Sequence, residues 1–134
     1  MPDRRFFDTN ILVYALAADD PRSGPAEALV ASGGVIGIQV LNELTSVMRR
    51  KLRWPWDQVD EALSVIEELL GPPRPLTAAI HVRAVALARE HTLPFYDALI
   101  VAAAIEADCQ LLCSEDMQHG RKFGALTIEN PFHH

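Results

Sequence analysis

The sequence predicts an α/β protein, an α/β/α sandwich in which helices cover both faces of a mainly parallel sheet. Short apolar runs alternate along the chain with longer segments whose apolar residues recur at helical spacing. Strands that alternate with helices in this way typically form a mainly parallel sheet. The chain has 134 residues, of which 49% are hydrophobic. This is enough to bury the core of one compact domain, expected to span residues 1–134.

The first half of the chain is expected to contain two strands and four helices. An apolar pair, Phe6 and Phe7, predicts a buried strand over residues 5–8, and β-branched residues predict a second strand over residues 35–38. The expected N-cap of the fourth helix is Asp57. Apolar residues at helical spacing and breaking residues between them predict helices at residues 10–18, 25–32, 39–52 and 57–70.

The second half of the chain continues the alternation after a proline-rich connection at residues 71–75. One helix is expected to be capped by Thr77 and to end near His91. The next, over residues 96–105, is apolar apart from one acid, which predicts a helix buried on most sides. The remaining elements are expected to be a strand at 111–113, a turn at 117–120 and a strand at 126–128.

The charge balance and the cysteines limit the class of protein. A net charge of −6 argues against binding nucleic acid by charge alone, and it is compatible with an acidic metal site or a basic protein partner. Cys109 and Cys113 are expected to be reduced core residues. The sequence contains no run of membrane-spanning length and no basic leader, so a cytoplasmic protein is expected. His133 and His134 resemble the start of a purification tag and are assigned no function.

Two acids stand where a buried strand or helix makes a carboxylate costly. Asp8 follows the first predicted strand, and ligands of parallel sheets bind at this edge. Asp97 is the only charge within residues 95–105, in a first turn where the helix dipole favours an anion. The alternative is that Asp8 and Asp97 only cap their helices. For the first helix, Thr9 or Asn10 could do this in place of Asp8. We interpret both acids as functional.

Two further acids complete a candidate set. Glu43 flanks the apolar stripe of its helix, and the alternative explanation is an ion pair with Arg49 or Arg50. Asp116 follows the strand at 111–113, at a turn, where Asp is common for structural reasons. The neighbouring Glu115 competes for the same role, and we favour Asp116.

Carboxylates gathered at one sheet edge repel each other and raise one another's pKa unless a cation lies between them. Ligands that offer only oxygen suit Mg²⁺ or Mn²⁺ and not zinc. One or two such ions can orient a phosphodiester and activate water. The sequence contains no Gly-x-x-x-x-Gly-Lys loop, no Gly-x-Ser-x-Gly elbow and no His-Glu-x-x-His pair that would indicate a competing chemistry.

The four acids, in this order, resemble those of the PIN-domain nucleases. The resemblance covers almost the whole chain, and its size and motifs are most similar to the VapC-like toxins of toxin–antitoxin pairs. It rests on FFDTNILVYA at residues 6–15, NELTSVM at 42–48, FYDALIVAAA at 95–104, LLCSEDMQHG at 111–120 and IENPF at 128–132.

The resemblance implies an endoribonuclease that uses Mg²⁺ or Mn²⁺, forms a homodimer, and is inhibited by a cognate antitoxin whose tail enters the acidic cleft. RNA is then the substrate. Asn10 and Ser114 are expected to support the site. The metal ligands and catalytic residues that the resemblance implies are Asp8, Glu43, Asp97 and Asp116.

Two basic clusters, at residues 49–53 and 121–122, are candidates for holding RNA phosphates, although both are equally compatible with ordinary solvated helix ends.

Two rival functions come from other classes of protein. One is a catalytically idle PIN-like binding module that acts through protein partners. The other is a phosphatase that uses Asp8 as a covalent nucleophile. Enzymes of the haloacid-dehalogenase kind carry a second Asp two residues later, and Asn10 in this position disfavours that reading.

Overall fold

The computed structural model describes residues 3–17 and 19–133. Ala18, the last residue of the first predicted helix, and His134 lie outside the described residues. The helices are α1 (Thr9–Leu16), α2 (Ser23–Ala31), α3 (Ile38–Arg50), α4 (Trp56–Leu70), α5 (Ala78–His91) and α6 (Phe95–Glu106). The strands are β1 (Arg5–Phe7), β2 (Leu111–Cys113), β3 (Lys122–Phe123) and β4 (Leu126–Glu129).

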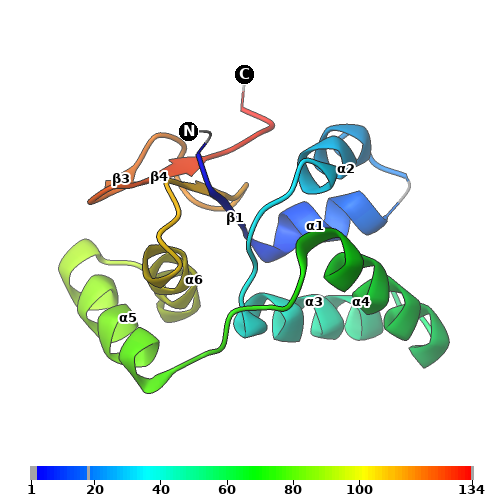
Figure 1. Ribbon diagram of the computed structural model, residues 1–134, viewed down its shortest axis with the longest axis horizontal. Helices are drawn as coiled ribbons and strands as arrows, with labels where there is room; N and C mark the ends of the chain where they lie inside the picture. Colours follow the sequence, from blue (N-terminus) through cyan, green and yellow to red (C-terminus); the bar gives the residue numbers. More distant parts are fainter. Residues whose placement is uncertain (1–2, 18, 134) are drawn as a thin grey trace.

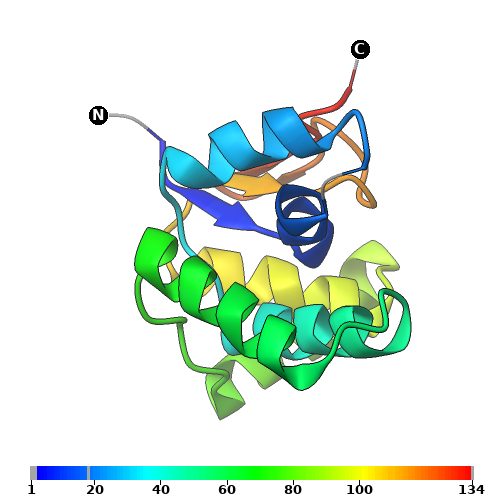
Figure 2. The same ribbon diagram turned by 90° about the vertical axis from the view of Figure 1, so that its right-hand side faces the viewer.

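The four strands form one sheet in the order β1-β2-β4-β3 (Figure 1). The pairs β1–β2 and β2–β4 are parallel, and only the β3–β4 pair is antiparallel. Helix α2 lies on one side of the sheet and α6 on the other (Figure 2). The prediction of an α/β/α sandwich around a mainly parallel sheet is therefore confirmed.

Helix α6 lies against the sheet and supplies much of the core. Its residues 98–104 are all buried, as the apolar run predicted. Four of these seven residues are alanines, whose small side chains allow the helix to approach its neighbours closely. Cys109 and Cys113 are buried and unpaired, in agreement with their predicted role in the core.

The parallel register brings the ends of β1 and β2 to one edge of the sheet. Phe7 pairs with Cys113, and the N–H of Asp8 donates to the carbonyl of Cys113 at 3.0 Å. The residues that follow these two strands, Asp8 and Ser114, are therefore neighbours although they are 106 positions apart in the sequence. This edge carries the polar residues described below.

The predicted strand at residues 35–38 is wrong. This segment makes only isolated bridges, from Val35 to Phe6 and from Gly37 to Arg74, and α3 already begins at Ile38. Its backbone hydrogen bonds are divided between β1 and the proline-rich connection, so no continuous ladder forms. The hairpin strand β3 was not predicted, because a strand of two residues has no detectable alternation.

The helix ends differ from the predictions by a few residues. Strand β1 ends at Phe7, and Asp8 is the N-cap of α1. The predicted N-cap of α4, Asp57, lies instead in its first turn, because Pro55 occupies the cap position. Thr77 caps α5 as predicted, and its side chain accepts from the N–H of Ile80. No helix in the described part of the chain is long and apolar enough to cross a membrane.

Candidate active site

A cleft of about 260 Å³ opens beside the C-terminal ends of β1 and β2. The four acids singled out from the sequence all line it, and each reaches it from a different segment. Asp8 lies between β1 and α1, Glu43 in α3, Asp97 in the first turn of α6, and Asp116 after β2. The lining residues are Asp8, Thr9, Asn10, Glu43, Ser46, Val47, Asp97 and Asp116.

Asp8 carries the most deeply buried carboxylate of the cleft, with 7% of the residue exposed. One oxygen accepts from the N–H of Thr9 at 2.7 Å, and the other accepts from the Ser114 hydroxyl at 2.8 Å. Burial raises the pKa of Asp8 to about 6, although these two hydrogen bonds oppose the change; the charges of Asp116 and Asp97 add to it. Asp8 thus caps α1 and also faces the other acids.

Ser114 fixes Asp8 relative to the segment that carries Asp116. Its side chain is fully buried. The hydroxyl donates to Asp8 and accepts from the N–H groups of Asp116 and Met117, at 3.3 and 3.4 Å. One buried hydroxyl therefore connects the end of β1 with the bend after β2, in keeping with the supporting position expected for this residue.

Glu43 is held by Thr9, whose hydroxyl donates to its carboxylate at 3.2 Å. Its pKa is raised, first by burial and then by the charge of Asp8. The alternative explanation for Glu43 was an ion pair with Arg49 or Arg50. Neither pair is present within residues 3–17 and 19–133.

Asp97 and Asp116 are the other two acids that line the cleft. Pro94 occupies the N-cap position of α6, so Asp97, in the first turn, is not the cap residue. Burial raises the pKa of Asp97, and the charge of Asp116 raises it further. Asp116 is exposed, and one of its carboxylate oxygens accepts from the side-chain amide of Asn10 at 2.6 Å.

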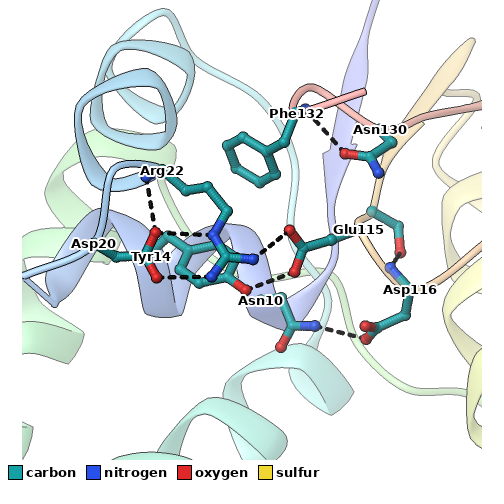
Figure 3. Close-up of polar contacts among 9 residues, drawn as sticks. Asn10, Tyr14, Asp20, Arg22, Glu115, Asp116, Asn130 and Phe132 are labelled. Carbon is teal, nitrogen blue, oxygen red and sulfur yellow. Dashed lines mark hydrogen bonds and ion pairs between the residues drawn. The ribbon is translucent and has the colours of Figure 1, made fainter. Parts of the chain in front are cut away.

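Glu115, which competed with Asp116 for a place in the site, does not line the cleft and lies instead between Tyr14 and Arg22 (Figure 3). Its two oxygens accept from the Tyr14 hydroxyl at 2.5 Å and from Arg22 at 2.7 Å. Burial alone would raise the pKa of Glu115, but these two hydrogen bonds lower it. Sequence reasoning did not find Tyr14, although it lies one helical turn after Asn10 on the same face of α1.

The donor set suits a hard divalent cation, since carboxylate, hydroxyl and amide oxygens line the cleft and no thiol or imidazole does. Burial is the main cause that raises the pKa of Asp8, Glu43 and Asp97, and the charges of neighbouring acids raise it further. Among the described residues, no three His, Cys, Asp or Glu side chains lie close enough together in this conformation to enclose one metal ion. Asp116 and Glu43 are instead engaged by Asn10 and Thr9.

The two basic clusters do not line the cleft. Arg49 donates to the carbonyl of Trp54 and lies 4.3 Å from the centre of the Trp56 ring. Arg121 donates to the carbonyl of His91 and lies 4.9 Å from the centre of the Phe123 ring. Their predicted contact with RNA stays a prediction.

Comparison with known proteins gives one family and a consistent fold. The PIN domain family matches residues 5–122. Among solved structures, a toxin–antitoxin complex from Klebsiella pneumoniae is similar with a TM-score of 0.72 at 20% identity, covering 96% of this chain and 98% of that one. No curated protein sequence matches the chain.

Two further structures give the same result. VapC20 from Mycobacterium tuberculosis, a toxin that cleaves the sarcin–ricin loop, has a TM-score of 0.69 at 22% identity and covers 84% of this chain and 91% of its own. VapBC2 from Rickettsia felis, bound to a DNA fragment from its promoter, has a TM-score of 0.69 at 22% identity and covers 94% and 97%. At these identities the likeness establishes the fold.

Proposed function

This chain belongs to the PIN domain family, and we propose that it is a metal-dependent endoribonuclease, the toxin of a toxin–antitoxin pair, built as a single nuclease domain over residues 1–134. The observation that carries the proposal is the meeting of four acids from four separate segments in one cleft. Like charges gathered in one place lower the stability of the fold unless a bound cation neutralises them. Burial, and after it the charges of neighbouring acids, raise the pKa of Asp8, Glu43 and Asp97, so the folded chain disfavours their charged forms.

Asp8, Glu43, Asp97 and Asp116 would hold Mg²⁺ or Mn²⁺. When bound, such an ion supplies Lewis-acid catalysis of phosphodiester hydrolysis. The protein contributes positioning. Ser114 and the N–H of Thr9 hold one Asp8 oxygen each, which fixes the plane of the carboxylate. Asn10 directs the carboxylate of Asp116. Fixed ligands lose little side-chain entropy when they bind.

An antitoxin partner is supported by the similar structures, several of which are toxin–antitoxin complexes. An acidic cleft attracts an arginine side chain, which pairs with carboxylates through two parallel hydrogen bonds. We therefore expect the cognate antitoxin to place an arginine between Asp8, Asp97 and Asp116. Replacing that arginine by alanine in the partner is expected to restore RNA cleavage or to weaken the complex.

The test is cleavage of single-stranded RNA by the purified chain in Mn²⁺. Asp97→Asn keeps the size of the side chain and removes the charge that a divalent ion requires, so cleavage is expected to be lost while the circular dichroism spectrum is unchanged. The surface substitution Glu67→Gln is the control and is expected to cleave as the wild type does. Cleavage that persists in Asp97→Asn contradicts the proposal. Absence of cleavage in the wild type with abundant Mn²⁺ and varied RNAs favours the idle binding module.

A further inference from the structure

The bend that follows β2 carries two neighbouring acids, Glu115 and Asp116, whose carboxylates meet different residues of α1 (Figure 3). Asp116 reaches into the carboxylate cleft, where Asn10 donates to it at 2.6 Å. Glu115 does not line the cleft, and it reaches Tyr14 of α1 and Arg22 at the start of α2. Because the two acids are adjacent in the chain, contacts that hold Glu115 also restrict the backbone that carries Asp116.

Glu115 is anchored at both carboxylate oxygens. The hydroxyl of Tyr14 donates to Oε1 at 2.5 Å, and the Nη1 atom of Arg22 donates to Oε2 at 2.7 Å. Both partners are far away in sequence, at separations of 101 and 93 residues. These contacts therefore join the bend to another part of the fold.

Arg22 and Tyr14 make further contacts of their own. Arg22 donates to both oxygens of Asp20, from Nε and Nη2 at 2.8 Å each, and its N–H donates to Asp20 at 2.9 Å. The guanidinium also stacks on Tyr14, 4.2 Å from the ring centre. The ring of Tyr14 also makes an edge-to-face contact with Phe132, at 5.5 Å between ring centres. These contacts restrict the orientation of the guanidinium that donates to Glu115.

Helix α1 holds both acids of the bend at the same time. Asn10 and Tyr14 lie four residues apart, so they project from the same face of the helix. Asn10 donates to Asp116, and Tyr14 donates to Glu115. The start of the same helix is capped by Asp8. The cap residue and the two acids of the bend are thus set by one rigid element.

We propose that Tyr14, Arg22 and Glu115 form a clamp that positions Asp116 for metal binding and keeps Glu115 out of the cleft. This inference rests on the proposed function, since it assumes that Asp116 is a metal ligand. The three members are positioning residues and do not themselves touch the ion. Without the clamp, the bend gains freedom and a fifth carboxylate is released beside the cleft.

The test measures Mn²⁺ binding to the folded protein by isothermal titration calorimetry. Tyr14→Phe removes one hydrogen bond and keeps the ring on which Arg22 and Phe132 pack. Arg22→Met removes the charged partner. Loss of a direct partner of a metal ligand weakens metal binding by about 10–100-fold. Because Arg22 acts on Asp116 only through Glu115 and the backbone, Arg22→Met is expected to weaken Mn²⁺ binding by about tenfold, and Tyr14→Phe by less. RNA cleavage by both variants is expected to lose kcat with little change in KM.

A matched control is Arg83→Met, which removes another partly exposed ion pair. Arg83 in α5 pairs with Glu106 in α6 at 3.1 Å, and neither residue lines the cleft. It is expected to leave Mn²⁺ affinity unchanged. If the wild type binds Mn²⁺ and both clamp variants bind it equally well, the clamp is overturned and the proposed function stands. If the wild type binds no Mn²⁺, the proposed function itself fails. Should Arg22→Met not fold, Tyr14→Phe alone decides the result.

Discussion

The burial of the Asp8 carboxylate lowers the free energy of unfolding at neutral pH, by an amount that follows from its pKa. Its pKa is raised from 3.8 to about 6, with burial as the largest cause. At 1.36 kcal/mol per pKa unit, this difference corresponds to about 3 kcal/mol. The folded state holds the proton more tightly than the unfolded state does. The contribution of Asp8 to stability is therefore complete below about pH 4 and is lost as the pH rises through about 6.

Asp8→Asn is expected to remove this dependence on pH. Asparagine caps helices about as well as aspartate, so α1 keeps its cap. The bond from Ser114 to a charged acceptor is lost, which offsets roughly half of the gain. The variant is therefore expected to be more stable than the wild type at neutral pH by about 1–2 kcal/mol, and the advantage is expected to vanish near pH 4.

The assay is urea denaturation in a buffer with a chelator, at neutral pH and near pH 4. Glu67→Gln, on the exposed face of α4, serves as the control and is expected to match the wild type at both values. If Asp8→Asn is less stable than the wild type by the same amount at both pH values, Asp8 acts only as a helix cap. The reasoning from burial then fails.

Three other predictions concern the same fold. Gly34→Ala is expected to cost about 1–3 kcal/mol in urea denaturation, because a Cβ there would lie 2.4 Å from Phe7 and 3.0 Å from the carbonyl of Arg5. Ser114→Ala removes a donor that lowers the pKa of Asp8, so the loss of stability with rising pH is expected to move to higher pH. Light scattering is expected to give twice the mass of one chain, because large apolar side chains are exposed on α5 (Val82), just before it (Leu76) and in the first turn of α6 (Tyr96). A monomer across a wide range of concentrations contradicts this.

The layered fold was predictable because its helices and buried strands carry clear apolar patterns. The run at 98–104 and the strand at 111–113 are examples, and both are as expected. The segment at 35–38 was misassigned because β-branched residues predict an extended backbone, but they do not predict which strands that backbone will pair with. Its hydrogen bonds go to two different segments, and this division is a tertiary property.

Asp8 and Asp97 could be singled out because a carboxylate beside or within an apolar run is costly, and this cost is visible in the sequence. Glu43 and Asp116 were weaker candidates, at the flank of an apolar stripe and at a turn. The hydrogen-bond partners of the acidic residues were not predictable. Thr9 looks like an ordinary first residue of a helix, and its bond to Glu43 spans 34 positions. Arg22 sits in a polar turn, where arginine is common, and nothing local indicates that it meets Glu115 93 positions later. Contacts of this kind come from topology.

The most direct test of the central claim is the position of a bound ion. Crystals of the wild type soaked in Mn²⁺ are expected to give an anomalous difference peak in the cleft, at coordination distance from Asp8, Asp97 and Asp116. The same soak of Asp8→Asn crystals is expected to give no peak there. A peak elsewhere on the molecule, or one in the cleft that persists unchanged in Asp8→Asn, would contradict the assignment of these acids as metal ligands.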